Sequence, residues 1–426
     1  MSAQSQDSST TLQLITANGL RRSDPAAAEA SYRAVLSKQT TDEQELKDQE
    51  MALLKLGSLY RDENKMSELA QLVVDSRGYM STVAKAKTAK LIRSLIDLFP
   101  PSARELQMKV TSENIEWARK ERRVFLRQSL EIKLVALHID AHNHRQALSL
   151  TEDLLKELKQ LDDKIILTEV FLLESRAAHA IQNLPRSKAA LTSARTAANS
   201  IYCPPILQAQ LDLQAGALNA DDKDYKTGYS YFFEAFEGFI QVDENDSRAL
   251  SSLKYMLLCK IMMGLPDDVA ALLTMKSAAR FAGKDLDAMK AVARAQTERS
   301  LEMFKRTLQD YQDQLHKDPL IRSHLSALYD TLLEQNLLRV IEPYSSVELS
   351  WIAHEVGQGR DVVEEKLSQM ILDQVFFGVL NEKAGTLEVF GEMQSEGLLS
   401  GAYDTMKQMG SVIQALYEKV SFCVPQ

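Results

Sequence analysis

The sequence from Ser346 to Phe390 reads SVELSWIAHEVGQGRDVVEEKLSQMILDQVFFGVLNEKAGTLEVF, and this stretch decides the fold of the 426-residue chain. Its first part has the spacing of helices. Val347–Val356 predicts one helix, and Gly357–Gly359 predicts the turn that ends it. In the helix that follows, the apolar residues at the spacing of a buried face are Val363, Leu367, Met370 and Ile371. This part therefore predicts two helices joined by a glycine turn.

The second part of the stretch changes from a helical period to a strand period. Phe377 and Val379 alternate on one predicted strand, and Leu387 and Val389 alternate on another. The loop Asn381–Gly385 has a length suited to a hairpin and a glycine near its end. Two helices followed by a β-hairpin make a winged helix, which we place at residues 346–390. The edge of its hairpin, with Phe377 and Val379, is a candidate protein-interaction surface.

Upstream of this module the chain is mostly helical and carries a weak internal repeat. Only 16 Gly and 10 Pro occur, which is few for a chain of this length. Three stretches share an apolar helix, a polar break and a second helix that starts with small residues: Leu134–Leu155, Phe171–Ala194 and Leu211–Phe236. Anchored on Ala147, Ala189 and Gly228, they repeat at a period of about forty residues. The pattern predicts a mostly α fold, a right-handed α-solenoid of tetratricopeptide-like helix pairs.

Prolines and an earlier copy of the repeat set the predicted boundaries. Leu53–Val73 resembles the later copies, with Gly57 and Tyr60 on a first helix and Ala70 on a second. A proline disfavours the helical conformation of the residue before it, so helix boundaries are predicted at Pro100-Pro101, Pro204-Pro205, Pro266 and Pro319. We expect a disordered tail at residues 1–11, the solenoid at 12–285, a helical part at 286–345, the winged helix, and a linker with a last helix at 391–426.

Composition narrows the class of protein. The formal net charge of -9 and a sequence pI of about 5.5 oppose a long basic groove for nucleic acid. Cys203, Cys259 and Cys423 are far apart and lack CxxC spacing, so reduced thiols are expected in a protein of the cytoplasm and nucleus. No apolar run reaches 18 residues, and the N-terminus lacks the pattern of a signal peptide. We expect no membrane segment.

No group of residues in the sequence has the pattern of a catalytic or cofactor site. His142 and His144 lack the Ser and Asp that a metalloisopeptidase motif places at fixed spacing after such a pair, and a loop between repeat helices suits them better. The run Gly357-Gln358-Gly359 follows a predicted helix, and Val362 occupies the place of the third glycine of a dinucleotide fingerprint. We therefore expect no enzyme activity, no metal and no cofactor.

Winged helices often bind DNA, so that alternative needs a physical test. The second helix, Asp361–Asp373, would enter the major groove. It carries Asp361, Glu364, Glu365 and Asp373 against Lys366, a net charge of -3. Because phosphate neutralisation supplies most nonspecific affinity, this charge opposes DNA binding and favours a protein-binding role.

The last helix has the spacing of a coiled-coil seam. Its apolar residues alternate steps of four and three at Ala402, Met406, Met409, Ile413, Leu416 and Val420. A helix with so short a seam is not stable alone and needs a partner surface. The seam packs either against the winged helix of the same chain or into a bundle of helices from other subunits. Its regularity and its place at the chain end favour the bundle.

A basic cluster in the first part of the solenoid is a further candidate surface. Arg119, Arg123 and Arg127 follow Trp117 at helix-compatible spacings. Such a run is commonly a solvated helix face. The functional alternative is docking to an acidic neighbour around Trp117.

Several long strings carry a resemblance to a known family. RSHLSALYDTLLEQNLLRVIEPYSSVELSWIA (Arg322–Ala353) and VEEKLSQMILDQVFFGVL (Val363–Leu380) look like a PCI domain. FLRQSLEIKLVAL (Phe125–Leu137) and LTSARTAANSIYCPPILQAQLDLQAG (Leu191–Gly216) closely resemble the non-ATPase regulatory subunit 11 family of the proteasome regulatory particle lid. The likeness covers roughly residues 91–417. The linker GEMQSEGLLSGAYDT departs from the longer, acidic, proline-containing linker expected for the family.

The resemblance implies a non-catalytic scaffold in a hetero-oligomer that supports ubiquitin-dependent protein degradation. In that family the solenoid would contact the α-ring of the core particle and the ATPase ring. The PCI domain, from about residue 286 to 390, would join other PCI lid subunits through its winged edge, and the last helix would enter the lid's helical bundle. No catalytic residue, nucleic acid or membrane is implied. A PCI subunit of a signalosome-type complex is the alternative within the class.

Overall fold

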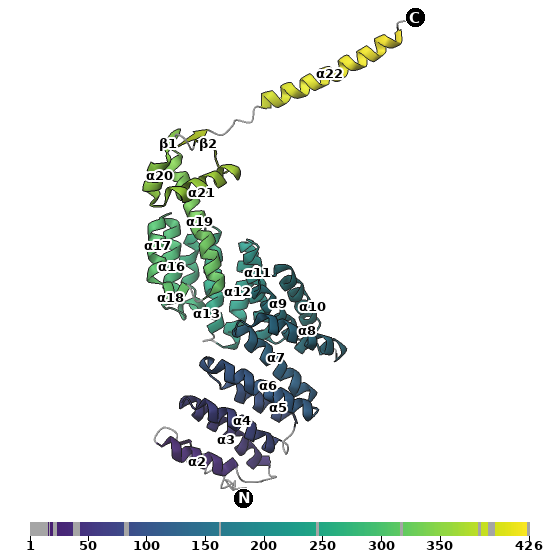
Figure 1. The fold of residues 1–426 in the computed structure, drawn as a ribbon, viewed down its shortest axis with the longest axis vertical. Helices are drawn as coiled ribbons and strands as arrows, with labels where there is room; N and C mark the ends of the chain where they lie inside the picture. Colours follow the sequence, from purple (N-terminus) through teal and green to yellow (C-terminus); the bar gives the residue numbers. More distant parts are fainter. Residues whose placement is uncertain are drawn as a thin grey trace. The chain divides into compact units, whose positions relative to one another are not determined.

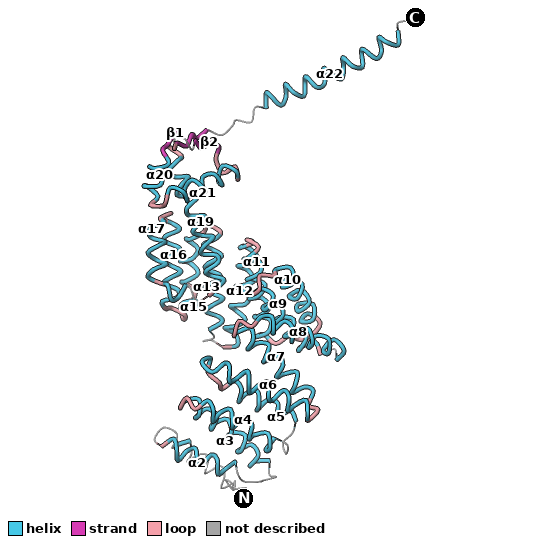
Figure 2. The backbone as a smooth tube through the Cα atoms, in the orientation of Figure 1, coloured by secondary structure: helices cyan, strands magenta, loops and turns pink. Residues whose placement is uncertain are grey.

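The computed structural model describes residues 16, 18–19, 24–36, 43–80, 85–161, 163–243, 247–315, 318–381, 385–390 and 397–423. Helices dominate these residues, and the strands are confined to one small sheet (Figures 1 and 2). The chain divides into two compact units, residues 1–252 and 253–426, and each is described by itself. The predicted tail at residues 1–11 lies outside the described residues. The prediction of a mostly α fold is confirmed.

The first unit is a row of paired helices. Within the described residues its elements are α2 (Pro25–Leu36), α3 (Glu43–Asp62), α4 (Met66–Met80), α5 (Lys85–Asp97), η1 (Pro101–Ala103), α6 (Arg104–Lys120), α7 (Val124–Asp140), α8 (His144–Leu161), α9 (Lys164–Ala180), α10 (Leu184–Asn199), α11 (Pro205–Asp221) and α12 (Tyr225–Val242). Each helix from α6 to α11 contacts the next one along the chain. The three predicted repeats correspond to α7/α8, α9/α10 and α11/α12.

One turn type closes successive helix pairs. A residue with positive φ stands between the two helices at His142 (61°), Gln182 (66°), Lys223 (67°) and Gly264 (74°). The next N–H donates back across the turn, from Asn143 to the His138 carbonyl and from Asn183 to the Ala178 carbonyl. These six-to-one bonds satisfy carbonyls that the helix end would leave free. The turn residues are 40 or 41 positions apart, so the turn itself carries the repeat.

The repeat is anchored on a different residue from the one predicted in the second pair. Ala147 and Gly228 are buried at the fourth position of α8 and α12, but Ala189 is exposed on α10. The fourth residue of α10 is Ser187, which is fully buried. Its hydroxyl donates to the Ser175 carbonyl of α9 over 2.8 Å, so a polar residue can fill the close approach of two helices. The anchor predicted at Ala189 was therefore wrong by two positions.

Polar side chains about one repeat apart connect neighbouring pairs. Lys133 of α7 lies 2.5 Å from Asp97 of α5. Arg186 of α10 lies 2.8 Å from both Glu152 of α8 and Glu174 of α9. The Lys133–Asp97 and Arg186–Glu152 contacts join residues 36 and 34 positions apart and so connect one helix pair to the next, whereas the Arg186–Glu174 contact lies within one pair.

The second unit contains a helical part and a winged helix. Its helical part comprises α13 (Ser247–Met262), which crosses the division, α14 (Pro266–Leu273), α15 (Lys276–Ala279), α16 (Lys284–Thr297), α17 (Leu301–Asp310), α18 (Gln312–Leu315) and α19 (Pro319–Ile341). A proline stands at the first position of η1, α11, α14 and α19, which confirms the predicted boundaries.

The described residues of the winged helix form three strands, one more than predicted. Its elements are β1 (Ser346–Glu348), α20 (Leu349–Val356), α21 (Arg360–Leu372), β2 (Phe377–Asn381) and β3 (Thr386–Phe390). Residues 347 and 348, predicted as helix, instead belong to β1, where Val347 pairs with Leu387. A three-residue strand is too short to show an alternating pattern. The strand order is β1-β3-β2, and both pairings are antiparallel.

The winged helix packs on α19 through named contacts. Lys366 of α21 pairs with Glu334 of α19 at 2.8 Å, and the Gln358 amide donates to the Tyr329 hydroxyl at 2.8 Å. Val363, Leu367 and Met370 are buried as predicted, and Gly357 ends α20 with φ of 65°. The glycine turn is required because a side chain is disfavoured at that backbone angle. The last helix is α22 (Gly397–Cys423).

Candidate interaction surfaces

The winged helix presents an open strand edge. β2 pairs with β3 on one side only, so it is an edge strand of the described sheet. Phe377 and Val379 of β2 are exposed, whereas Leu387 of the central strand is fully buried. An edge strand with exposed apolar residues offers both backbone groups and side chains to a neighbour. The candidate residues Phe377 and Val379 thus lie together on an accessible edge.

The charge of the second helix of the winged module is less negative than the sequence reading gave. α21 begins at Arg360 and ends at Leu372, with Asp373 as its C-cap. The helix carries Arg360 and Lys366 against Asp361, Glu364 and Glu365, a net charge of -1 in place of -3. Lys366 is already paired with Glu334. The helix is still not basic, but the electrostatic argument against DNA is weaker than predicted.

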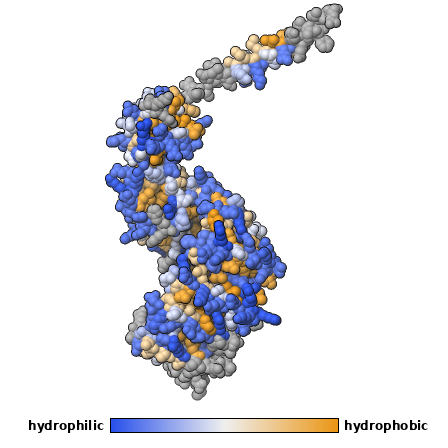
Figure 3. Space-filling view, in the orientation of Figure 1, coloured by the Kyte–Doolittle hydropathy of each residue, from blue (hydrophilic) through white to orange (hydrophobic). Residues whose placement is uncertain are grey.

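The described part of α22 is exposed on every side. All side chains from residue 401 to 416 are exposed. Apolar side chains gather on one side of the helix and hydrophilic ones on the other (Figure 3). The exposed fractions of the seam residues Met406, Met409, Ile413 and Leu416 run from 57% to 74%. Ala402 is exposed too, and the side chain of Val420 lies outside the described residues. The seam has no cover within the described chain.

In the cluster around Trp117, the charges of Arg119 and Arg127 are partly neutralised by ion pairs within the chain. The Arg123 guanidinium lies 5.0 Å from the centre of the Trp117 ring, and Trp117 packs against the core of the first unit. Arg119 and Arg127 both reach Glu131, at 3.8 and 3.9 Å. Arg127 pairs with Glu157 as well, and its side chain is 17% exposed against 68% for Arg119. The cluster is therefore largely an internal ion-pair network.

The carboxyl group of Glu131 completes this network. Burial raises the pKa of the Glu131 carboxyl group. The nearby Arg127 and Arg119 guanidinium groups lower this pKa, and the Glu157 carboxylate raises it. Desolvation is the largest of these effects, so the guanidinium groups only partly offset the cost of burying the carboxylate. The arginines thus act first on their own chain, and only Arg119 offers a mainly exposed cation to a partner.

The two histidines lie where the pattern placed them. His142 is the turn residue between α7 and α8, and His144 begins α8. Their ring centres are 5.8 Å apart. Among the described residues no group of three or more His, Cys, Asp or Glu side chains is arranged to hold a metal ion.

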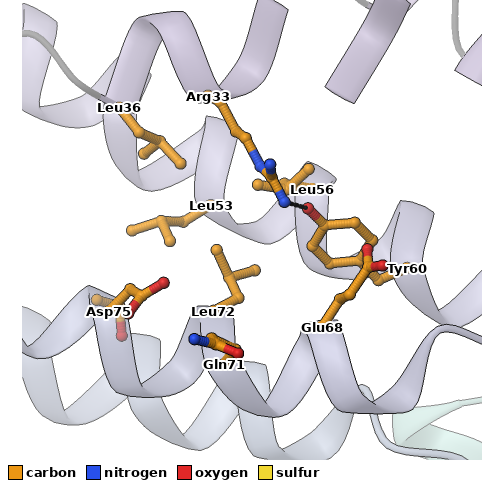
Figure 4. Close-up of a pocket in the computed structure, with 10 residues that line it drawn as sticks. Arg33, Leu36, Leu53, Leu56, Tyr60, Glu68, Gln71, Leu72 and Asp75 are labelled. Atoms are coloured by element: carbon orange, nitrogen blue, oxygen red, sulfur yellow. Dashed lines mark hydrogen bonds between the residues drawn. The ribbon is translucent and has the colours of Figure 1, made fainter. Parts of the chain in front are cut away.

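A groove of about 540 Å³ opens between α2, α3 and α4 in the first unit (Figure 4). Leu53 and Leu56 line it from α3, and Asp75 lines it from α4. Arg33 of α2 donates to the Tyr60 hydroxyl at 2.9 Å across one end.

The two hydroxyl groups in the groove lining, those of Ser76 and Tyr60, are already hydrogen-bonded. Ser76 donates its hydroxyl to the Val73 carbonyl at 2.7 Å, so that group is committed to its own helix. Tyr60 donates to Glu29 at 2.9 Å, and burial followed by this bond raises the pKa of Tyr60. The sequence reading missed this groove because α2 was not assigned to a repeat.

No helix among the described residues has the length and apolar character needed to cross a bilayer.

Two family models match the chain. One is described as "26S proteasome regulatory subunit RPN6 N-terminal domain" and matches residues 10–141. The other is described as "PCI domain" and matches residues 308–390. The first covers the groove and the Trp117 cluster, and the second covers the winged helix.

Curated relatives are similar over nearly the whole chain. The probable 26S proteasome regulatory subunit rpn6 of Schizosaccharomyces pombe is 50% identical over 404 residues, which are 94% of this chain and 96% of the relative. The 26S proteasome non-ATPase regulatory subunit 11 homolog of Arabidopsis thaliana is 47% identical over 90% of this chain and 91% of its own. The 26S proteasome regulatory subunit RPN6 of Saccharomyces cerevisiae is 44% identical over 92% of each chain.

Proposed function

The chain belongs to the 26S proteasome regulatory subunit RPN6 family, also named non-ATPase regulatory subunit 11, and from this we propose that it is a non-catalytic scaffold of the regulatory particle lid. In this role it supports ubiquitin-dependent protein degradation by holding other subunits together. The observation that carries the proposal is the exposed seam of α22, in a chain otherwise built of packed helix pairs. Such a seam is a surface for assembly.

The open edge of the winged helix supplies a lateral joint. β2 offers the free side of its backbone together with Phe377 and Val379, and a neighbouring PCI subunit would cover both. The net charge of -1 on α21 favours a protein neighbour over a phosphate backbone.

α22 supplies a second joint, which does not depend on the sheet. Its seam residues are spaced for knobs-into-holes packing with other helices. Burying four large apolar side chains gains about 1.5–3 kcal/mol each before the entropic cost of association. A bundle with helices of other lid subunits is therefore the favoured place for α22.

The solenoid supplies an extended surface for contacts with other subunits. Helix pairs that contact mainly their neighbours form an extended surface, and we propose that this surface contacts the α-ring of the core particle and the ATPase ring. The groove between α2, α3 and α4 and the exposed Arg119 are parts of that surface.

The test of the proposal is affinity purification of the tagged full-length chain, with mass spectrometry of what accompanies it. Core-particle α subunits, ATPases and other lid subunits are expected together. Recovery of a signalosome-type set would move the chain to the alternative PCI complex. Recovery alone or with nucleic acid would overturn the scaffold proposal.

Deleting most of α22 tests whether this helix joins the chain to the complex. A chain lacking Ala402–Gln426 should fold normally, because the described side chains from residue 401 to 416 are exposed, but it should fail to enter the lid. Circular dichroism and thermal unfolding check the fold, and native gel electrophoresis checks incorporation. Normal incorporation of the shortened chain would remove α22 from the assembly role.

A further inference from the structure

The groove between α2, α3 and α4 has an apolar floor. Leu53 and Leu56 contribute to it from α3, and Leu72 contributes from α4. The lining residues of α4 stand at positions 68, 71, 72 and 75, which is the spacing of one helix face. A volume of about 540 Å³ lies within the range of ligand pockets, so the groove can take a few side chains of a partner.

A carboxylate stands at each end of this floor. Glu68 and Asp75 are seven residues apart, a distance of about 10 Å along α4. Figure 4 shows Gln71 and Leu72 between them. Asp75 is exposed and Glu68 is half-buried. Among the residues that the structure describes, neither carboxylate has an ion-pair or hydrogen-bond partner.

The cations beside the groove are bound to other groups of the chain. Arg33, the cation among the described lining residues, pairs with Glu29 at 2.8 Å and donates to the Tyr60 hydroxyl at 2.9 Å. Lys65, in the turn between α3 and α4, pairs with Glu63 at 2.9 Å. The positive charges at the groove are therefore used within the chain, whereas the two carboxylates of the lining are not.

The surrounding helices have the same sign of charge. The sequences of α2, α3 and α4 contain eight acidic against five basic residues, a net charge of -3. On α3, one turn before Leu53, the Oε1 atom of Glu50 is buried without a hydrogen-bond partner in the described chain. The next helix, α5, is basic, but none of its described side chains is among the residues that line the groove. The field at the groove thus attracts a cationic segment.

We propose that the groove binds an extended segment of another protein in which an apolar side chain is flanked by Lys or Arg. The apolar side chain enters between Leu53, Leu56 and Leu72, and the flanking cations pair with Glu68 and Asp75. In an extended chain, cations about three residues apart span the separation of the two carboxylates. The inference rests on the scaffold role proposed above, which makes another subunit the source of the segment, and it adds the chemistry by which the segment is recognised.

The first experiment places the photoreactive residue p-benzoylphenylalanine at Gln71, which is exposed and lines the groove. After irradiation of the complex purified through the tagged full-length chain, mass spectrometry identifies the cross-linked peptide. It should be a segment of another subunit with an apolar residue flanked by Lys or Arg. The same photoreactive residue at Val74, which is exposed on α4 and is not among the lining residues, is the control and should not yield this segment.

The second experiment measures the affinity of the full-length chain for a synthetic copy of the cross-linked segment by fluorescence anisotropy. Replacing both carboxylates (Glu68→Gln with Asp75→Asn) should raise the Kd about fivefold at low salt, which is the effect of losing two partly exposed ion pairs. The difference should shrink at high salt because the pairs are screened. The control pair Glu113→Gln and Glu116→Gln removes the same charge from exposed positions of α6 and should leave the Kd unchanged. The thermal unfolding temperature should be the same for both pairs.

The outcomes separate this inference from the scaffold proposal. An acidic segment at Gln71, the same cross-link at Val74, or an equal rise in Kd for both pairs of substitutions would overturn the basic occupant. Proteasome subunits that co-purify without any cross-link at Gln71 would overturn the groove and leave the scaffold role standing. A basic segment from a protein outside the proteasome would support the chemistry of the groove and overturn the scaffold role.

Discussion

Gly216 of α11 lies directly against the ring of Phe232 of α12. A Cβ built on Gly216 would stand 2.7 Å from both Cδ1 and Cε1 of Phe232, and the ring is fully buried. The absence of a side chain at residue 216 is therefore what lets these two helices pack at their observed separation.

The change Gly216→Ala should destabilise the chain. Alanine favours a helix by about 1 kcal/mol over glycine, but overpacking against a buried ring costs about 1–3 kcal/mol, so a net loss is expected. Chemical denaturation measures it. As a control, Gly401→Ala in α22, with nothing within 4 Å of its Cβ, should be neutral or favourable. A stabilising effect at residue 216 would show that the ring can move aside.

The change Arg195→Ala should cost about 2 kcal/mol, less than for a fully buried pair because Arg195 is partly exposed. Arg195 joins α10 to α11 and α12: it lies 3.1 Å from Asp212, donates to the Tyr231 hydroxyl at 3.0 Å and stacks on the Tyr231 ring. Its loss leaves the buried Asp212 carboxylate with a hydrogen bond from the Gln208 amide and without its cation.

The loss of stability caused by Arg195→Ala should become smaller as the pH falls. Burial raises the pKa of Asp212, while Gln208 and Arg195 lower it. A carboxyl group whose pKa is higher in the folded than in the unfolded chain stabilises the fold at low pH, and this contribution is lost as pH rises through the folded pKa. Unfolding at pH 7 and pH 5 tests this. Adding Asp212→Asn to Arg195→Ala should abolish the pH dependence of the loss; its persistence would exclude Asp212 as the cause.

Cys259 of α13 should resist thiol reagents at pH 8 in the folded chain. Burial raises its pKa from 9.0 to about 12, and the thiolate is the reactive form. Labelling should therefore follow unfolding, and adding denaturant should release it. Because the folded pKa exceeds the unfolded one, the thiol's contribution to stability falls as pH rises above 9. The variant Cys259→Ser identifies the labelled site by mass spectrometry, and fast labelling without denaturant would contradict the burial.

Acidic residues in the seam of α22 should block assembly without unfolding the chain. The pair Met409→Glu and Ile413→Glu places charge at exposed positions. The free energy of unfolding, measured by thermal unfolding, should therefore change by less than about 0.5 kcal/mol. Entry into the lid, followed by native gels, should be lost. The pair Gln408→Glu and Ser411→Glu adds the same charge off the seam and should assemble normally. Equal defects in both pairs would mean that charge, not the seam, is responsible.

The sequence predicted the elements whose signals are local. Prolines mark the starts of η1, α11, α14 and α19, and the apolar period defines the buried face of α21. Prediction from the sequence failed where contacts between distant segments determine the local structure. β1 is too short to show a period, and its pairing with β3 is visible only in the fold. The burial of Ser187 was overlooked because serine is a polar residue type. Its burial is explained by the hydrogen bond from its hydroxyl to the Ser175 carbonyl, which only the structure shows.

The candidate surfaces were predictable only in part. The seam of α22 and the strand with Phe377 follow from spacing, and both are accessible. Arg119 and Arg127 appeared free in the sequence, although Glu131 stands four residues after Arg127 on α7. The approach of Arg119 on α6 to Glu131, and of Arg127 to Glu157 on α8, is visible only in the fold.

The uncovered edge of β2 has a consequence for the chain before assembly. A strand with an unpaired backbone edge and exposed Phe377 and Val379 is a template for pairing with another copy of the same strand. A high concentration of the chain without a covering partner is then expected to favour strand pairing between copies. The edge that we propose as a joint with other subunits makes an excess of this chain an aggregation hazard.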